Sequence, residues 1–272
     1  MMRVVRCMTN TSKAVINNIS LILALTKRDI LSKYRGSMMG IFWSLVNPIL
    51  MLVVYTFVFS VVFKAKWGQG TGSQTEFALT LFAGLMIYSL FSEVVGRSPS
   101  LIVANVNYVK KVVFPIEILS VVALLSSLFN FFISFCVWFV FLWVFYATPS
   151  WELILLPVII FPLCLMMLGI SWFLAALGVY LRDISQVVSV LLMILMYLSP
   201  IFYPVDVLPE SFQAVMYASP LTFVIEQCRT IMMWGGNVDW LGLVVYTAIS
   251  AVVYMLGAIW FDFTRKGFAD VV

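Results

Sequence analysis

Few side chains in this sequence could carry out chemistry on a substrate. The chain contains no histidine, which is the commonest proton shuttle and a frequent metal ligand. It has neither a Cys-x-x-Cys pair nor clustered carboxylates that could replace histidine, so we expect no metal site. No Gly-x-x-x-x-Gly-Lys-Ser/Thr stretch occurs, so the chain has no P-loop to cradle nucleotide phosphates. Work driven by ATP would need another chain to bind the nucleotide.

Three ionisable residues, Glu93, Arg97 and Glu117, lie beside long apolar stretches. Ionisable groups at membrane depth are functional candidates, but near a helix end they reach the interface at little cost. A local ion pair between Glu93 and Arg97 is the simplest interpretation of the first two. Because no chain of buried acids accompanies them, the sequence gives little support to a proton-coupled carrier.

Two other segments carry groups that could bind a partner. Residues 12–36 are basic, and cations at a membrane interface attract anionic head groups. The stretch "NVNYVKKVVFP", Asn105 to Pro115, lies between two apolar runs and contains two asparagines, a tyrosine and a pair of lysines. A generic basic loop is one interpretation of that stretch, and a contact with another molecule is the other.

The composition shows what must position these groups. The chain has 272 residues, of which 63% are hydrophobic and 10% are charged. An ordinary soluble domain has roughly a quarter charged residues, and no soluble core could hide so much apolar surface. The bilayer is therefore the solvent for most of this protein.

The apolar residues fall into stretches long enough to cross a membrane, and we expect an all-α integral membrane fold. The six predicted spans are residues 38–63, 77–95, 115–146, 153–180, 184–203 and 240–261. An even number of spans places both termini on one side. Thirteen of the sixteen lysines and arginines lie in the N-terminal segment, the second and fourth connections and the tail. The positive-inside rule therefore predicts that both termini and the 105–115 stretch are cytoplasmic.

The chain divides at residue 37 into a cytoplasmic N-terminus and a six-helix transmembrane domain, residues 38–272. Within residues 12–36 the spacing predicts an interfacial helix along the inner leaflet. The residues near its apolar face are Ile19, Ile22, Leu23, Ile30 and Tyr34, and those on the polar face are Arg28, Ser32 and Arg35.

The outer connection, residues 205–239, is too apolar for a free loop and too short to cross the membrane and return. We expect two short helices within residues 205–236, with Pro209 and Pro220 in their first turns, Ser219 as a cap and Gly235-Gly236 as the stop. Such a pair would dip into the outer leaflet and line a cavity, because irregular backbone at membrane depth needs protein or water around it. An ordinary external hairpin is the alternative.

Aromatic residues make up 16% of the chain. Tyr55, Phe59 and Phe63 recur at every fourth position of the first predicted span, and Tyr88 and Phe91 lie on the second. Aromatic faces pack against the C–H faces of sugars. They also pack against lipid and neighbouring helices, so the pattern alone does not choose between these roles.

Several stretches together resemble a known family. "KRDILSKYRGSMMGIFWSLVNPILMLVVYTFVFSVVF" resembles the start of the membrane subunit of type-2 ABC exporters of polysaccharide. "NVNYVKKVVFPIEIL", "GVYLRDISQVVSVLLMILMYLSPIFYPVDVLP" and "SPLTFVIEQCR" resemble later motifs of that family in the expected order. The resemblance covers about residues 20 to 230. The chain departs from the family pattern at Ile116 and Ser219, which affects only local contacts at two turns.

The resemblance implies a function and an assembly. Members of the family are non-catalytic permease subunits of the bacterial inner membrane that form homodimers. They pair with two copies of a separate ATPase, which holds ATP and Mg, and this chain would carry no cofactor of its own. The substrate would be an undecaprenyl-diphosphate-linked polysaccharide such as O-antigen, membrane lipids would surround the protein, and no nucleic acid partner is implied.

The resemblance also gives the candidate residues their roles. It implies a coupling helix at about residues 98–113, whose ATPase-docking residues would be Asn105, Asn107, Tyr108, Lys110 and Lys111. Lipid-diphosphate contacts would come from Lys27, Arg28, Lys33 and Arg35, although anchoring to anionic membrane lipids explains these cations equally well. Tyr55, Phe59, Tyr88 and Phe91 would line a glycan tunnel. Pro220, Glu226 and Arg229 would belong to the outer gate.

Two other functions remain open from the sequence. A type-2 ABC permease for a drug or small lipid needs the same architecture. A membrane-embedded glycosyltransferase or acyltransferase needs an acid pair or a histidine base at the membrane surface, and the sequence offers neither.

Overall fold

The computed structural model describes residues 15–58, 74–110, 114–146 and 148–271. Over these ranges the chain forms helices and no β-strand. The α-helices are α2 Ile19–Lys33, α3 Trp43–Tyr55, α4 Gln74–Arg97, α5 Val106–Lys110, α6 Ile118–Phe145, α7 Leu156–Tyr180, α8 Ile184–Tyr197, α9 Glu210–Tyr217, α10 Thr222–Met233, α11 Trp240–Thr264 and α12 Phe268–Val271. The 3-10 turns are η1 Gly40–Phe42, η3 Ser98–Ser100, η4 Val103–Asn105, η5 Trp151–Leu155, η6 Val205–Val207 and η7 Arg265–Gly267.

In the described part of the chain, five helical stretches are long and apolar enough to cross a membrane. They are Gly40–Val58, Thr75–Ser100, Ile118–Phe145, Trp151–Tyr180 and Trp240–Gly267. Five of the six predicted spans correspond to these stretches, although residues 59–63 of the first lie outside the described residues. All-helical architecture with several spanning helices is thus confirmed.

The sixth predicted span, residues 184–203, differs from the expectation. Helix α8 covers only Ile184–Tyr197, which is 14 residues. At about 1.5 Å per residue this helix is roughly 21 Å long, shorter than the hydrocarbon core of about 30 Å. The helix stops before Ser199-Pro200, because a proline disfavours the helical conformation of the residue before it.

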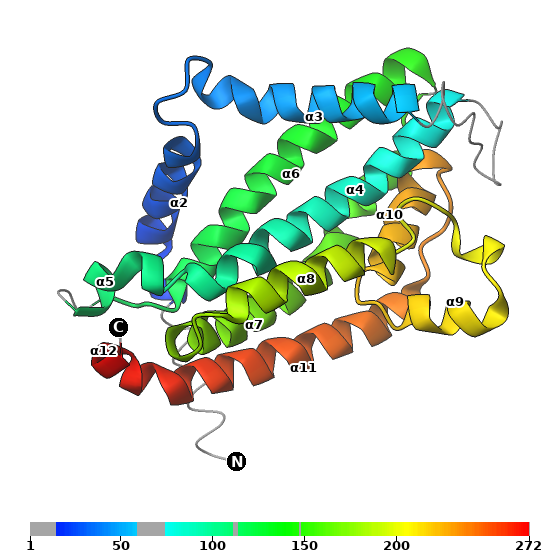
Figure 1. Ribbon diagram of the computed structural model, residues 1–272. Helices are drawn as coiled ribbons and strands as arrows, with labels where there is room; N and C mark the ends of the chain where they lie inside the picture. The colour runs from blue at the N-terminus through cyan, green and yellow to red at the C-terminus, as the bar shows by residue number, and fades with distance from the viewer. Residues whose placement is uncertain (1–14, 59–73, 111–113, 147, 272) are drawn as a thin grey trace.

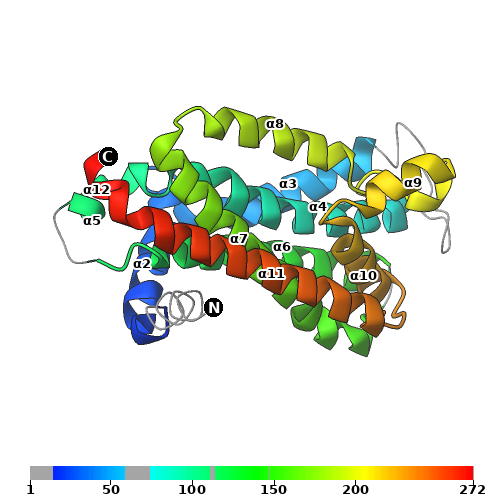
Figure 2. The same ribbon diagram turned by 90° about the horizontal axis from the view of Figure 1, so that it is seen from below.

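The long helices lie side by side, and the short ones gather at the two ends (Figure 1). Helices α5 and α12 lie at one end, and α9 and α10 lie at the opposite end, which a second view also shows (Figure 2). Helix α2 runs across the direction of the bundle at the α5 end (Figure 1). This crosswise course fits the predicted interfacial helix.

Helix α4 is the centre of the bundle. In the Thr75–Ser100 stretch, 78% of the most apolar 18-residue segment is buried inside the protein. The corresponding share in the Gly40–Val58 stretch is 11%. Helix α4 packs against α3, α6, α7, α8 and α10. Helix α3 lies at the periphery, where it exposes large apolar side chains such as Leu50 and Val54. Such a surface suits lipid or another subunit better than water.

Helices α7 and α11 are held close by glycines. A Cβ atom built on Gly169 would meet the backbone of Val253, and one built on Gly257 would meet the backbone of Gly169. Small residues at a crossing let two helix backbones approach closely, which is a common way to join helices in a membrane. Gly178 of α7 similarly leaves room for the backbone of Pro99 in η3. Turn η3, which begins the predicted coupling helix of residues 98–113, is therefore packed directly on α7.

Candidate functional site

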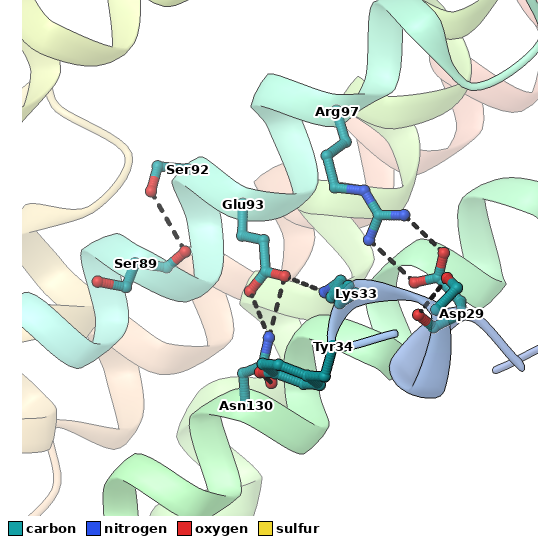
Figure 3. A network of polar contacts seen from close by, with 9 residues as sticks. Asp29, Lys33, Tyr34, Ser89, Ser92, Glu93, Arg97 and Asn130 are labelled. Carbon is teal, nitrogen blue, oxygen red and sulfur yellow. Dashed lines mark hydrogen bonds and ion pairs between the residues drawn. The ribbon is translucent and has the colours of Figure 1, made fainter. Parts of the chain in front are cut away.

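Two ion pairs join α2 to α4 (Figure 3). Arg97 donates through Nη1 and Nη2 to the two carboxylate oxygens of Asp29, at 3.0 and 2.7 Å. Lys33 donates through Nζ to Oε1 of Glu93. The local Glu93–Arg97 pair expected from the sequence is therefore not the arrangement, because each of the two α4 residues meets the opposite charge on α2.

Asn130 of α6 extends this network (Figure 3). Its Nδ2 donates to Oε1 and Oε2 of Glu93 at 3.0 and 3.1 Å. The hydroxyl of Tyr34 lies 3.4 Å from Oδ1 of Asn130, at the long limit of a hydrogen bond. Polar contacts therefore tie α2, α4 and α6 together in one place.

The electrostatics of the network favour an ionised Asp29. Burial is the largest single effect and raises the pKa of this carboxyl, but hydrogen bonds, first of all from Arg97, and nearby positive charges together outweigh it. The charges of Arg97 and Lys33 act in the same direction, so the pKa of Asp29 lies below the ordinary value for an aspartate.

This lowered pKa predicts a pH dependence. An acid whose pKa is lower in the folded state contributes stability above its unfolded pKa of about 3.9, and loses that contribution as the pH falls through its folded pKa. We expect Asp29→Asn to lower the free energy of unfolding by about 1 kcal/mol at pH 7, since both partners are partly exposed. The variant should also lose less stability than the wild type below about pH 4. Thermal unfolding in detergent across this pH range measures both effects.

Glu210→Gln is the matched control, because Glu210 is an exposed acid on α9 at the far end of the bundle. An Asp29→Asn variant with the stability and pH profile of this control would contradict the proposed role of the pair.

Four of the five predicted docking residues lie in η4 and α5, next to α2 (Figure 1). Asn105 donates through Nδ2 to the carbonyl of Leu101 at 2.8 Å, and Asn107 is exposed. The ring of Tyr108 stacks on Phe114, with the ring centres 4.4 Å apart. The guanidinium carbon of Arg28 lies 5.8 Å from the centre of the Tyr108 ring, a cation–π contact. Helix α5 ends at Lys110, whereas Lys111 lies outside the described residues.

The structure brings three of the four predicted head-group cations together. Lys27, Arg28 and Arg35 line one groove on α2, with a volume of about 510 Å³. Lys33 is not part of this groove, because its ammonium group is bound to Glu93. Arg28 lines the groove and also contacts Tyr108 of α5, so the groove adjoins the predicted docking helix.

The three predicted tunnel aromatics that the structure describes have different surroundings. Tyr55 lines a cavity between α3, α4 and α6. The hydroxyl of Tyr88 donates to the carbonyl of Leu192 in α8 at 3.0 Å, and Phe91 is buried in the core. Phe59 lies outside the described residues. Among the three described aromatics of this set, Tyr55 therefore lines a cavity, whereas Tyr88 and Phe91 make contacts within the protein.

Two of the three predicted gate residues, Arg229 and Pro220, hold α10 and the turn before it on the bundle. Arg229 is 3% exposed, and its guanidinium donates to the carbonyls of Thr80, Pro200 and Ile201. The Thr80 and Ile201 contacts are 2.9 and 2.7 Å long. The carbonyl of Pro220 accepts a hydrogen bond of 2.8 Å from Tyr246 of α11. These contacts pack α10 into the protein, whereas α9 exposes Phe212 and Val215 and packs against α10 and η6.

The predicted ends of these helices are close to the observed ones. Pro209 directly precedes α9, whereas Pro220 lies two residues before α10. Helix α10 ends at Met233, and Gly235 then adopts a left-handed φ of 58° while Gly236 N–H donates to the carbonyl of Thr230.

The third predicted gate residue, Glu226, also lies on α10. Burial raises the pKa of its carboxyl. The charge of Arg229 opposes this effect, and the carboxylate of Asp206 adds to it.

Sequence reasoning missed Asp29 and Asn130 as parts of the site. Each carried a weak signal in the sequence. Asp29 is the one acidic residue among the first 37 residues of the sequence, whose other charged residues are basic. Asn130 is the one amide in the apolar sequence of α6. On the predicted apolar face of α2, Ile22 is buried against the protein, whereas Ile19 and Leu23 are exposed.

Comparison with known proteins places this arrangement in a family. The model of the ABC-2 type transporter family matches residues 20–233. The O-antigen export system permease protein RfbA of Myxococcus xanthus is 28% identical over 254 residues, which are 93% of this chain and 95% of the relative. A protein of the same name from Klebsiella pneumoniae is 27% identical over the same shares. The polysialic acid transport protein KpsM of Escherichia coli is 25% identical over 219 residues, which are 78% of this chain and 81% of the relative.

The match to the family covers the helices from α2 to α10. These helices contain the polar network, the cationic groove and the predicted docking helix α5. The match covers well over half of the chain. This chain belongs to the ABC-2 type transporter family.

Proposed function

We propose that this chain is the transmembrane subunit of an ATP-driven exporter that moves a lipid-linked polysaccharide, such as O-antigen, out of the cytoplasm. The observation that carries this proposal is the alignment, over 93% of the chain, with permeases named for O-antigen export. The chain has no P-loop, so the ATP that drives export, with its Mg, would be bound and hydrolysed by a separate subunit. In this role the chain itself catalyses no reaction.

The proposed assembly is a homodimer of this chain with two copies of the ATPase in the bacterial inner membrane. The exposed apolar surface of α3 supports contact with lipid or a second copy. Helix α5, with Asn105, Asn107, Tyr108 and Lys110 followed by Lys111, would dock on the ATPase. The α9–α10 hairpin, fixed by Arg229, would be part of the outer gate.

The cationic groove on α2 is the proposed contact for the substrate's lipid diphosphate. Lys27, Arg28 and Arg35 line it together, and a diphosphate needs several cations within reach of its oxygens. Because Arg28 also lies over the ring of Tyr108, a head group bound here would be in contact with the docking helix. Anionic membrane lipids present the same phosphate chemistry, so lipids compete for this groove.

We further propose that α8 is a sixth span, completed by residues that follow its C-terminal end, and that both termini are cytoplasmic. Helix α8 lies alongside α4 and is bonded to it through Tyr88. The ends that carry α5 and α9 are opposite each other, as this orientation requires (Figure 2).

This orientation predicts how two introduced cysteines react with a membrane-impermeant maleimide. A cysteine replacing the exposed Glu210 of α9 should be labelled in intact spheroplasts. A cysteine replacing the exposed Asn107 of α5 should be labelled only after permeabilisation. The experiment needs a background in which the native cysteines are replaced by serine. Labelling of both positions from the same side would contradict the orientation.

The function is tested by deleting the gene in its natural host. Lipid-linked polysaccharide should then accumulate inside the cell and disappear from the surface, and a plasmid copy should reverse both effects. Unchanged surface polysaccharide in the deletion strain would overturn the proposal. A permease for a drug or small lipid has no specific observation in its favour.

A further inference from the structure

A cavity of about 270 Å³ lies between α3, α4 and α6. One part of its wall is polar and consists of Tyr34, Ser44, Asn47, Ser89, Asn130 and Ser134. The other part is apolar and includes Met51, Tyr55 and Phe82. We call this space the α3–α4–α6 cavity.

Some of the polar groups of this cavity are satisfied by the protein. Ser44 donates to the carbonyl of Ile41, Ser134 donates to the carbonyl of Asn130, and the Asn130 amide is bound to Glu93. The side chains of Asn47 and Ser89 differ, since within the described residues neither makes a hydrogen bond and both are exposed. An amide and a hydroxyl are thus open to whatever occupies the cavity.

These groups lie where a membrane protein seldom exposes polarity. Asn47, Ser89 and Asn130 belong to three different spanning stretches. An unsatisfied polar group in contact with lipid tails is costly, so polar side chains in spans face protein, water or a polar ligand. Asn47 and Ser89 therefore indicate that the occupant of the cavity is polar.

The charge and shape of the lining narrow the class of ligand. Every side chain that lines the cavity is neutral, and the adjacent carboxylate of Glu93 is already bound by Lys33 and Asn130. A neutral ligand needs no counter-ion, whereas a phosphate would face no cation here. The hydroxyls and amides of the lining suit the hydroxyl groups of a sugar, and the ring of Tyr55 and the side chain of Phe82 suit its C–H face.

We propose that the α3–α4–α6 cavity binds one neutral sugar unit of the exported chain. This inference rests on the proposed function and deepens it. The volume of about 270 Å³ is at the small end for ligand pockets, which suits one unit better than an oligosaccharide. A few neutral hydrogen bonds and contacts with two aromatic side chains give weak binding, as transit requires.

Photo-crosslinking tests the proposal directly. A p-benzoylphenylalanine is placed at Asn47 in the complete complex, in cells that make radiolabelled lipid-linked polysaccharide. Leu45 is the matched control, because it is 40% exposed on the same helix, does not line the cavity and lies about 200° around the axis from Asn47. We expect at least fivefold more crosslinked glycan from position 47 than from position 45.

Other outcomes at position 47 would overturn the proposal. They are crosslinks to phospholipid alone, crosslinks to a second copy of the chain alone, and glycan crosslinks no more frequent than at position 45. Export is measured separately, in cells that also carry a plasmid copy of the wild-type gene. If the wild-type protein exports polysaccharide normally, any of these crosslinking outcomes refutes only the sugar site. If the wild-type protein exports no polysaccharide, the proposed function is refuted and the site with it.

A conservative pair of variants gives a second measurement. Asn47→Leu removes the amide at similar volume, and Asn47→Gln keeps it. The leucine variant should lower export severalfold while copurified ATPase stays unchanged, and the glutamine variant should export more than the leucine variant. Equal export by the two variants would show that the amide does not contact the substrate.

Discussion

Replacing Arg229 by methionine should remove most of the folded protein from the membrane. The guanidinium is 3% exposed and donates to three backbone carbonyls, those of Thr80, Pro200 and Ile201. Methionine has a similar length but no donor, so the carbonyls of the loop after α8 would be left buried without a partner. Removing one member of such a buried charged contact lowers stability by about 3–5 kcal/mol.

The measurement is the amount of monodisperse protein extracted in detergent, together with its thermal unfolding. Arg182→Met is the control, because Arg182 is exposed in the turn between α7 and α8. We expect the control to behave like the wild type. An Arg229→Met protein with wild-type yield and melting temperature would show that these three hydrogen bonds do not hold the hairpin.

A change on α4 tests the same contact from the other side. A Cβ atom on Gly84 would lie 2.5 Å from Nη2 of Arg229, so Gly84→Ala should displace the guanidinium. A Cβ atom on Gly96 of the same helix would lie 3.3 Å from a flexible methyl group of Leu192. Gly96→Ala should therefore have a much smaller effect than Gly84→Ala on thermal unfolding.

The second large effect concerns the docking helix. The double variant Lys110→Glu/Lys111→Glu should remain in the membrane in normal amounts but export at least tenfold less polysaccharide. The reason is that α5, which ends at Lys110, lies at the same end of the molecule as α2 with its cationic groove, where an ATPase would bind (Figure 1). Lys111 follows Lys110 directly in the sequence. Reversing two charges at a protein interface costs several kcal/mol of binding when like charges then meet.

Surface polysaccharide and the amount of ATPase that copurifies measure this effect. Arg182→Glu/Lys266→Glu makes the same change in net charge at two exposed cations outside α5. We expect this control to keep most of its ATPase and its export. Equal loss in both double variants would mean that general charge, and not docking through α5, controls the interaction.

The long elements of the fold could be predicted from the sequence because hydropathy alone decides them. A stretch such as Ile118–Phe145 has one stable state in a bilayer, a helix that satisfies its own backbone. Helix α8 was overestimated because apolar composition continues beyond Tyr197, whereas the Ser199-Pro200 step ends the helix. Hydropathy does not register that constraint on the backbone.

The polar network was beyond sequence reasoning for a different reason. Glu93 and Arg97 are four residues apart and form a plausible local pair, which is all that a sequence can show. Their partners Asp29 and Lys33 belong to a helix that crosses the bundle, and its direction depends on tertiary packing. Tyr88 and Phe91 illustrate the same limit, because their aromatic character fits a tunnel, a helix contact and a core equally well.

The most direct test of the proposed function is export by the purified complex. The chain is copurified with the ATPase encoded beside it and reconstituted into proteoliposomes that contain lipid-linked polysaccharide. The glycan should become protected from an external glycosidase only when ATP and Mg are added to the ATPase side. Protection without ATP, or an active complex that moves small lipids but leaves the polysaccharide outside, would contradict the assignment.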